Sequence, residues 1–472
     1  MVLVFVLHGG RGDVARRMVV PSLAVLHRRG LLPEHWALIG TGRNVVGTEE
    51  YEDLVRESLD EFGDAREDDV AALTRHAMFT GEVGEDEPGE LPGVLEEIRG
   101  SLAEAASGSP ADVVVVHYLA VPPQAFVPLT RALGKHGLAR GPDGRHETVR
   151  VVYEKPYGTS PESFRELDAV VHEVLEEDQV FRIDHFLGKE AVQNLHVLRF
   201  ANELFASVWD RHHVAQVQID VPEDLDVAGR AEFYDATGAA LDMVVSHLFQ
   251  VAAQVAMEPP PNLDSDGLVA AREAALGDFR PLNPDDVVLG QFEGYRDIEG
   301  ISGSSTTDTF IAARLWIDND RWRGVPFLLR SGKRMATSAM QVTLVLRRVP
   351  ECLYGDRVPA GSIAVSLAGD GVIEVTSAVK RPGPDLALGV GTLRLNLDDV
   401  GGGLPPYASL LDDVLRGDRT LFTTPTGLES AWRAFAPLLG DERPQVLPYA
   451  RGSWGPAEAL ELAGRDGWAL GK

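Results

Sequence analysis

The chain has 472 residues, of which 44% are apolar and 25% are charged, so it is long enough for two domains and its composition excludes extensive disorder. Its formal charge of −28 at pH 7 opposes attraction to a nucleic acid or to an anionic bilayer, and we expect neither as a partner. The single cysteine, Cys352, excludes an intrachain disulfide and a cysteine zinc cluster, as is typical of a reducing cytoplasm.

From residue 1 to about residue 190, apolar strand-like runs alternate with amphipathic segments of helical spacing. The strand candidates are Val2–Leu7, Trp36–Gly40, Val113–Tyr118 and Val149–Tyr153. Such alternation is typical of βαβ units and predicts a parallel sheet. Ser160 followed by Pro161 predicts the start of a helix that runs to about Glu177.

After about residue 190 the pattern changes to helices followed by many strands of period-two alternation. Helices are expected near Ala191–Phe205 and Leu241–Met257, and examples of the strands are Thr309–Trp316, Gln341–Arg347 and Ile373–Thr376. The pattern predicts an α+β half with a large antiparallel or mixed sheet. Polar residues interrupt Leu241–Met257, and no basic segment precedes Val2–Leu7. We therefore expect a core helix and a buried strand rather than a membrane span and a signal peptide, in a soluble protein.

A glycine-rich turn follows the first predicted strand. In His8–Ala15, glycines let the backbone come close to a pyrophosphate, while the next helix directs its free N–H groups at the anion. By itself such a turn is explained equally well by simple turn geometry. Arg43 follows the second strand, where a carboxylate would hold the ribose of NAD. A guanidinium there can bind the extra phosphate of NADP, so Arg43 favours NADP, with a solvated surface arginine as the alternative.

Lysine is rare in this chain, since only 6 of the 44 lysine and arginine residues are lysines. Three of them lie in polar, turn or terminal contexts and are expected at the surface: Lys135, Lys380 and Lys472. The others lie beside glycine or proline: Lys155, Lys189 and Lys333. A compact ammonium suits a phosphate or a hydroxyl where a planar guanidinium would be too bulky. We therefore regard the second set as candidate ligand-binding residues, although such placement also arises by chance.

Acid–base residues are concentrated in Arg182–Glu190, where cations, a carboxylate and an imidazole occur within nine residues. Such density is uncommon in a scaffold segment. Farther along, Asp242 and His247 lie on the predicted helix at 241–257. They are five residues apart, and on an α-helix they do not share a face. His247 has apolar neighbours, and a histidine in that setting is more often a satisfied core residue than a base.

The run Arg182–Glu190 closely resembles the signature of the glucose-6-phosphate dehydrogenase family. The resemblance spans almost the whole chain in the family's order, through Gly9–Ala15, Tyr118–Pro123, Glu154–Gly158, Tyr234–His247, Ala256–Pro260, Gly290–Gly294, Arg321–Lys333 and Tyr407–Phe422. It implies an α/β Rossmann-like coenzyme domain at 1–190 and an α+β substrate-binding domain with a large mixed sheet at 191–472. It further implies a homodimer or homotetramer formed through that sheet.

The resemblance also implies an activity and the residues that perform it. The activity is oxidation of C1 of glucose 6-phosphate to 6-phosphoglucono-1,5-lactone with NADP, in the pentose phosphate pathway of the cytoplasm, and no metal is required. His247 resembles the general base and Asp184 its carboxylate partner. The substrate-binding residues implied by the family pattern are Lys155, His185, Lys189, Glu223, Asp242 and Lys333. The cofactor-binding residues are Gly9, Gly12, Asp13, Val14, Arg43 and Lys155.

Several residues depart from the family pattern, and most of them lie on the substrate side. Phe186 replaces a tyrosine, Ser338 a basic residue, Ser246 an asparagine, Leu241 an arginine, and Arg11 a small hydroxyl residue. Each lost phosphate donor weakens binding by roughly 1–3 kcal/mol if nothing replaces it. Two alternatives therefore stay open: the same oxidation of another hexose phosphate or an amino-sugar phosphate, and a non-catalytic nucleotide-binding homologue. NAD also remains a possible coenzyme if Arg43 swings aside.

Overall fold

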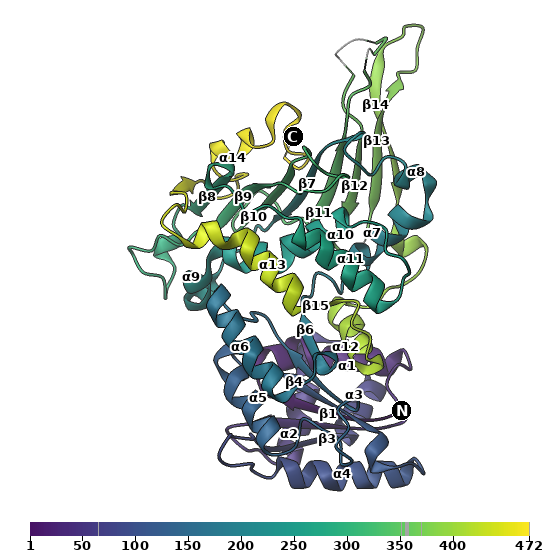
Figure 1. The fold of residues 1–472 in the computed structure, drawn as a ribbon, viewed down its shortest axis with the longest axis vertical. Helices are drawn as coiled ribbons and strands as arrows, with labels where there is room; N and C mark the ends of the chain where they lie inside the picture. The colour runs from purple at the N-terminus through teal and green to yellow at the C-terminus, as the bar shows by residue number, and fades with distance from the viewer. Residues whose placement is uncertain (65, 351, 355–357, 370, 472) are drawn as a thin grey trace. The chain divides into compact units, whose positions relative to one another are not determined.

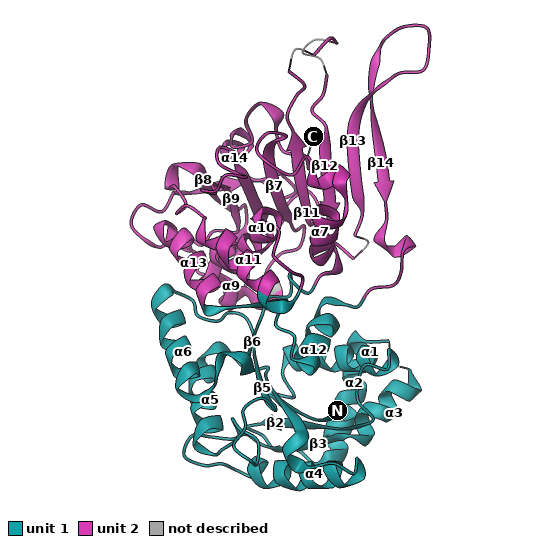
Figure 2. Cartoon of the chain, turned by 45° about the vertical axis from the view of Figure 1, so that its right-hand side comes forward, with its two compact units in different colours: residues 1–188, 264–266, 404–425 teal, residues 189–263, 267–403, 426–472 magenta. Residues whose placement is uncertain are grey.

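A computed structural model describes residues 1–64, 66–350, 352–354, 358–369 and 371–471. Within these residues the chain forms two compact units (Figure 2). The first unit comprises residues 1–188, 264–266 and 404–425, and the second comprises the remainder. The predicted division at residue 190 thus lies close to the first boundary. The segment at 404–425 was expected in the C-terminal domain and belongs to the first unit.

In the part of the chain that the structure describes, the first sheet has seven strands in the order β15-β6-β5-β4-β1-β2-β3 (Figure 1). Strand β15 is antiparallel to β6, and the other pairs are parallel. The strand bounds are β1 Val2–His8, β2 His35–Gly42, β3 Ala77–Gly81, β4 Val113–Leu119, β5 Val149–Tyr153, β6 Val180–Ile183 and β15 Phe422–Thr423. The predicted strands are confirmed, whereas β3 and β6 were not predicted.

The central strands of this sheet are buried almost completely, as expected where both faces of a parallel sheet are covered. Residues 3–7 of β1 have no exposed surface. The helices of this unit are α1 Val20–Arg28, α2 Thr48–Phe62, α3 Glu67–Arg75, α4 Leu91–Ala105, α5 Phe126–Lys135, α6 Pro161–Val174 and α12 Pro406–Arg416. Helix α6 starts where predicted, because the Ser160 hydroxyl caps it by accepting the N–H of Ser163. It ends at Val174, before the predicted Glu177, because Leu175 is extended.

Over the described residues, the second sheet has nine strands in the order β14-β13-β12-β11-β7-β10-β9-β8-β16. It is mixed, with parallel pairs β7–β10 and β8–β16 in an otherwise antiparallel arrangement. The strand bounds are β7 Val214–Pro222, β8 Val287–Phe292, β9 Phe310–Leu315, β10 Phe327–Gly332, β11 Gln341–Leu346, β12 Ser362–Ser366, β13 Ile373–Lys380, β14 Leu388–Leu395 and β16 Val446–Tyr449. The predicted α+β half with a large mixed sheet is confirmed.

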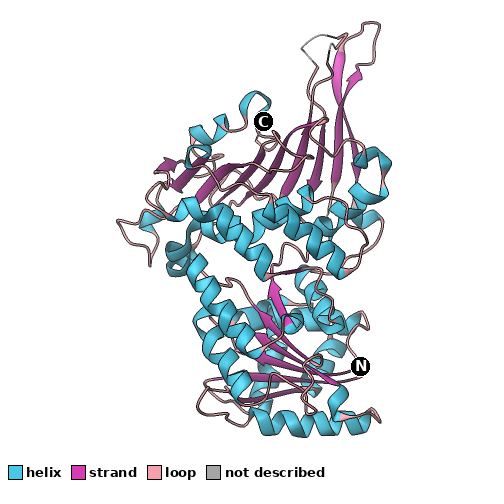
Figure 3. Cartoon of the chain, in the orientation of Figure 1, coloured by secondary structure: helices cyan, strands magenta, loops and turns pink. Residues whose placement is uncertain are grey.

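Helices lie along one face of this second sheet (Figure 3). Their bounds are α7 Glu190–Ala201, α8 Glu203–Ala206, α9 Ala231–Ala240, α10 Phe249–Ala256, α11 Ser265–Gly277 and α13 Pro425–Phe435, and α14 spans Ala457–Glu461. The predicted helix at 191–205 is split at Asn202, whose φ of −129° and ψ of 112° are extended. Between α9 and α10 the chain forms a π-helix, η6, at Leu241–Leu248.

The helical stretch Ala231–Ala256 is long and apolar enough to cross a membrane by length and composition, with a hydropathy of 1.3. However, 83% of its apolar window is buried inside the protein. That burial is what we expect of a core helix, which passes the same length and composition test. Lys135 and Lys380 are exposed as predicted, and Lys472 lies outside the described residues.

Candidate active site

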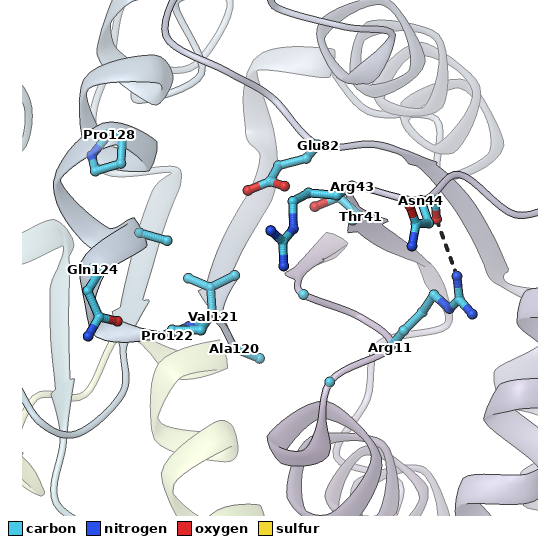
Figure 4. A pocket seen from close by; sticks show the side chains of 14 residues that line it. Arg11, Thr41, Arg43, Asn44, Glu82, Ala120, Val121, Pro122, Gln124 and Pro128 are labelled. Atoms are coloured by element: carbon cyan, nitrogen blue, oxygen red, sulfur yellow. Dashed lines mark hydrogen bonds between the residues drawn. The ribbon is translucent and has the colours of Figure 1, made fainter. Parts of the chain in front are cut away.

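A pocket of about 710 Å³ opens at the carboxyl ends of β1, β2 and β4 (Figure 4). Its walls come from the turns after these strands, at residues 9–12, 41–44 and 120–125. The sheet order reverses beside β1, with β2 on one side and β4 on the other. In open α/β sheets a ligand binds in the crevice at this reversal, so the pocket lies where a dinucleotide is expected.

The glycines of the first turn let the backbone fold closely against itself and against the turn after β4. Gly9 has a φ of +75°, and a Cβ there would lie 2.4 Å from the carbonyl oxygen of Ala120. A Cβ at Gly12 would lie 3.1 Å from the carbonyl oxygen of Gly9. The turn is held by N–H groups of Gly9 and Gly10 that both donate to Thr41, at 3.0 Å. This tight glycine turn lines the pocket just before a helix, and such a cradle suits the pyrophosphate of a nucleotide.

Two arginines line the same pocket. Figure 4 shows the guanidinium of Arg43 pointing into the pocket near Glu82, while Arg11 reaches from the glycine turn toward Asn44. Nη1 of Arg11 donates to the carbonyl oxygen of Asn44 at 3.4 Å. A guanidinium in this place suits a phosphate on the ribose. Of the predicted cofactor-binding residues, Gly9, Gly12 and Arg43 therefore come together here.

The residues that line this pocket do not include the other predicted cofactor-binding residues, Asp13, Val14 and Lys155. Asp13 forms an ion pair with Arg17, with 2.7 Å between Oδ1 and Nε. Val14 precedes the short π-helix η1, Ala15–Val19. Lys155 follows β5 and its backbone N–H donates to Glu154 at 3.3 Å.

Glu154 is the centre of a buried cluster that the sequence did not reveal. Its Oε1 accepts the hydroxyl of Tyr118, on β4, at 2.5 Å, and its Oε2 accepts that of Tyr407, on α12, at 3.5 Å. The side chain is 7% exposed, and this burial raises the pKa of Glu154. These contacts fix the backbone immediately before Lys155. Both tyrosines stand in segments that carry the family resemblance, which was the available signal.

Asp184 and His185 follow β6 directly. Asp184 is 2% exposed, and its Oδ1 accepts the backbone N–H of Phe186 at 2.9 Å. The imidazole of His185 contacts the Phe186 ring, at 5.0 Å between centroids, and stacks with Tyr407 at 6.3 Å. Rings on two sides thus restrict the orientation of His185. In the first unit, the structure brings together Lys155, Glu154, Tyr407 and His185 as one connected group.

In the second unit, Glu223 and Lys333 follow β7 and β10. These strands are parallel neighbours in which Pro222 pairs with Gly332, so the next residues meet at one edge of the sheet. Nζ of Lys333 donates to Oε2 of Glu223 at 2.6 Å, and it lies 5.7 Å from the ring centroid of Tyr234. Burial raises the pKa of Tyr234, and the negative charge of Asp242 adds to this. Glu223, Asp242 and Lys333, which are all predicted to bind the sugar, therefore lie near the phenol of Tyr234.

His247 and Asp242 both lie in η6, and His247 is 2% exposed. A π-helix joins residues five apart, as in the bond from the N–H of Phe249 to the oxygen of Val244. Asp242 and His247 are therefore about one turn apart and on nearly the same side of the helix. The prediction that they do not share a face was wrong because it assumed an α-helix. Ser246 donates its hydroxyl to the carbonyl oxygen of Asp242 at 2.9 Å.

Ser338 occupies the position where the family pattern has a basic residue, and it is bound to Asp224. The Ser338 hydroxyl accepts the backbone N–H of Asp224 at 3.0 Å and donates to the Asp224 carboxylate. An acidic side chain next to Glu223 is thereby held at the edge of the predicted sugar site. Lys189 stands immediately before α7. Asp184 and His247 belong to different units, so their pairing stays a prediction.

Comparison with known proteins gives the family. Residues 6–194 match the model described as glucose-6-phosphate dehydrogenase, NAD binding domain, and residues 196–469 match that described as glucose-6-phosphate dehydrogenase, C-terminal domain. The chain belongs to the glucose-6-phosphate dehydrogenase family. The resemblance inferred from the sequence is thereby confirmed, and the first unit contains the family's nucleotide-binding domain.

Similarity to individual members of the family extends over nearly the whole chain. Glucose-6-phosphate 1-dehydrogenase 1 of Mycobacterium tuberculosis is 36% identical, over 98% of this chain and 95% of that protein. The crystal structure of glucose-6-phosphate 1-dehydrogenase from Mycobacterium avium is 33% identical, with a TM-score of 0.85 and coverage of 99% and 98%. A glucose-6-phosphate dehydrogenase solved with its substrate, glucose 6-phosphate, is 26% identical, with a TM-score of 0.90 and coverage of 100% and 98%.

Proposed function

We propose that the protein oxidises C1 of glucose 6-phosphate to 6-phosphoglucono-1,5-lactone. The observation that carries this proposal is that family similarity covers both units while the proposed base, its acid partner and the ligand-binding lysines are all present. A fold alone does not imply an activity. Here the residues that the chemistry needs accompany the fold.

In the proposed mechanism, His247 removes the proton of the C1 hydroxyl. Asp184 orients its imidazole and stabilises the imidazolium that forms. His185 and Lys189 hold the sugar phosphate, and their binding energy positions C1 relative to the base. Glu223, Asp242 and Lys333 bind the sugar hydroxyls.

We propose NADP as the coenzyme. When bound, its nicotinamide accepts the hydride from C1. The turn containing Gly9, Gly12, Asp13 and Val14 receives the pyrophosphate, and Arg43 binds the phosphate on the ribose. Lys155 lies between coenzyme and sugar in this proposal. The cradle around Gly9 and the position of Arg43 in the same pocket support it, and NAD is tolerated if Arg43 turns away.

We further propose a cytoplasmic homodimer or homotetramer that assembles through the second sheet. Strands β13 and β14 lie at one edge of this sheet and expose apolar side chains on both faces, with Val379, Leu393 and Leu395 on one face and Val390 on the other. Exposed apolar surface of this kind is typical of an interface between subunits. Analytical ultracentrifugation tests the proposal, and a monomer at micromolar concentration would refute it.

The alternative substrate is another hexose phosphate or an amino-sugar phosphate. It is favoured by Ser338, which replaces a cation and holds the Asp224 carboxylate near Glu223. A carboxylate there would suit the ammonium of an amino sugar better than an additional phosphate contact. Steady-state kinetics with a panel of sugar phosphates, each with NADP and NAD, separates the two substrates.

The activity itself has a direct test. Purified protein given glucose 6-phosphate and NADP should produce reduced-nicotinamide absorbance, and His247→Ala should lose nearly all of it. The sterically similar His247→Asn is a second variant for the case in which alanine disturbs folding. A flat trace with every sugar phosphate and both coenzymes would favour the non-catalytic nucleotide-binding homologue.

A further inference from the structure

The helical stretch that carries His247 is interrupted at Gly238, whose φ of 72° and ψ of 169° are not helical. The next two backbone amides turn to Asp308. The N–H of Ala239 donates to the Asp308 carbonyl oxygen at 2.8 Å, and the N–H of Ala240 donates to its Oδ2 at 2.7 Å. Asp308 thus satisfies the first amides of the segment that continues into η6, as a capping residue does.

Asp308 is held tightly at this position. It is 1% exposed, and a Cβ at Gly238 would lie 2.7 Å from its Oδ1, so only glycine allows the carboxylate to approach so closely. Nη2 of Arg443 donates to the same Oδ1. A buried carboxylate is strongly destabilising without such a partner.

Arg443 connects this buried contact to solvent. Its side chain is 41% exposed and lines a pocket of about 810 Å³, together with Arg296, Gln291 and Phe292. A small cation can therefore reach the place of the guanidinium from outside the protein.

The segment that begins at Asp308 also fixes a predicted sugar-binding residue. The next residue, Thr309, accepts the backbone N–H of Lys333 at 2.9 Å through its carbonyl oxygen. One short stretch of chain therefore holds the start of the helix that carries His247 and the backbone of Lys333. A shift of this stretch would move both groups.

We propose that Asp308 and Arg443 are positioning residues that fix the start of η6 and thereby the place of His247. The inference rests on the proposed role of His247 as the base. π-Helices occur as single turns inside α-helices and need support from their surroundings. Because catalysis depends on near-attack geometry, a small displacement of the base lowers kcat even though nothing in contact with the substrate has changed.

The test is Arg443→Ala, for which we expect kcat to fall by about tenfold while KM for the sugar phosphate stays within about twofold. Burial already raises the pKa of Asp308, and without the guanidinium the carboxyl takes up a proton more readily. The loss should therefore be greater at the acidic end of the pH profile. Among the described residues, the phenols of Tyr234, Tyr295 and Tyr449 also interact with Asp308, and burial raises the pKa of each.

Chemical rescue separates positioning from general destabilisation. Millimolar guanidinium chloride should restore several-fold activity to Arg443→Ala, because the ion can enter the pocket and pair with Asp308. It should not restore Asp308→Asn, which has lost the carboxylate. The matched control is Arg296→Ala, which lines the same pocket but binds Gln291, at 3.1 Å; its kcat should not change, with or without guanidinium.

Hydrogen–deuterium exchange provides a readout that does not depend on activity. Peptides covering 239–248 should exchange faster in Arg443→Ala than in the unchanged protein, and guanidinium should slow them again. Wild-type kcat in a folded Arg443→Ala, or lost activity with neither rescue nor faster exchange at 239–248, would overturn the inference. If the unchanged protein oxidises no sugar phosphate, the proposed function fails, and the exchange measurement still decides whether the pair holds η6.

Discussion

At the centre of the first sheet, two histidines lie next to each other on neighbouring parallel strands. His8 on β1 and His117 on β4 have no exposed surface, and Nε2 of His8 lies 3.1 Å from Nδ1 of His117. At the centre of the second sheet, Asp220 on β7 pairs in register with Arg330 on β10. Nε of Arg330 donates a hydrogen bond to Oδ1 of Asp220 at 2.8 Å, and both residues are buried.

Both sheets thus bury a pair of polar side chains, but the pair is neutral in the first sheet and ionic in the second. Burial lowers the pKa of His8 to about 3 and that of His117 well below its ordinary value, so both imidazoles stay neutral. In the second sheet, Arg330 is always charged and the carboxylate of Asp220 compensates it. We therefore expect the His8–His117 pair to cost stability in acid, and the Asp220–Arg330 pair to be sensitive to removal of one charge partner.

The largest expected effect is that of Asp220→Ala. It leaves the guanidinium of Arg330 buried without its carboxylate, held by the rings of Trp454 and Trp468 at 4.8 and 4.2 Å from their centroids. We expect a loss of about 3–5 kcal/mol in the free energy of unfolding, measured by urea denaturation. The exposed pair Arg280–Asp318 supplies the control, because an ion pair in solvent contributes little and Asp318→Ala should lose far less stability. Equal losses in the two variants would mean that the buried pair contributes no more to stability than an exposed one.

The second effect is a pH dependence of stability that originates from His8 in the first unit. The pKa of His8 is about 3 when folded and ordinary when unfolded, so the unfolded chain binds more protons below about pH 6.5. Above that pH the histidine has no effect, and stability falls as pH decreases toward 3. At about pH 5 the contribution of His8 amounts to a loss of roughly 2 kcal/mol.

Urea denaturation of the unchanged protein and of His8→Asn, at a series of pH values, measures this term. The variant should show a smaller decline in stability between pH 7 and pH 5. If His8→Asn and the unchanged protein decline in parallel, the neutral histidine pair is not the origin of the acid sensitivity.

The sequence predicted the elements whose pattern is set locally. Strands such as β1 and β4 are continuous apolar runs because both faces of a parallel sheet are covered. Strand β6 was missed because it is short and contains Arg182, whose partners Asp168 and Glu177 come from outside the strand. Contacts between distant parts of the chain could not be predicted from local patterns either. Glu154 and Tyr407, for example, form a hydrogen bond although they are 253 residues apart.

The π-helix η6 was not predicted from the sequence for a different reason. The apolar pattern of residues 241–248 suits an α-helix and a π-helix equally, so it does not distinguish between them. The amide just before η6 binds Asp308, a contact over 68 residues that a local pattern does not reveal. In contrast, the candidate ligand-binding residues were named from short motifs of the family resemblance, and their roles stay predictions. Gly9, Gly12 and Arg43 line one pocket in the structure, whereas Asp13 and Val14 do not line it.

The third effect concerns the choice between NADP and NAD, which we expect Arg43 of the first unit to determine. In Arg43→Ala, we expect the dissociation constant for NADP to rise by about ten- to a hundredfold, because a charge-assisted contact to phosphate is lost. Binding of NAD, which lacks that phosphate, should change little. Isothermal titration calorimetry with both coenzymes measures the difference directly. An equal loss for both would mean that Arg43 supports the pocket rather than reading the phosphate.

The smallest expected effect is a gain, from Phe186→Tyr. Phe186 is 2% exposed and contacts His185, one of the proposed phosphate ligands, with 5.0 Å between ring centroids. A hydroxyl at this ring would restore the donor that the family pattern places there. One additional hydrogen bond to a phosphate should lower KM for glucose 6-phosphate by about fivefold, while kcat stays constant because the base is untouched.

Steady-state kinetics on the sugar-phosphate panel should show this gain only for substrates whose phosphate occupies the same place. A uniform gain, or a fall in kcat, would mean that the residue shapes His185 through packing and not through a missing donor.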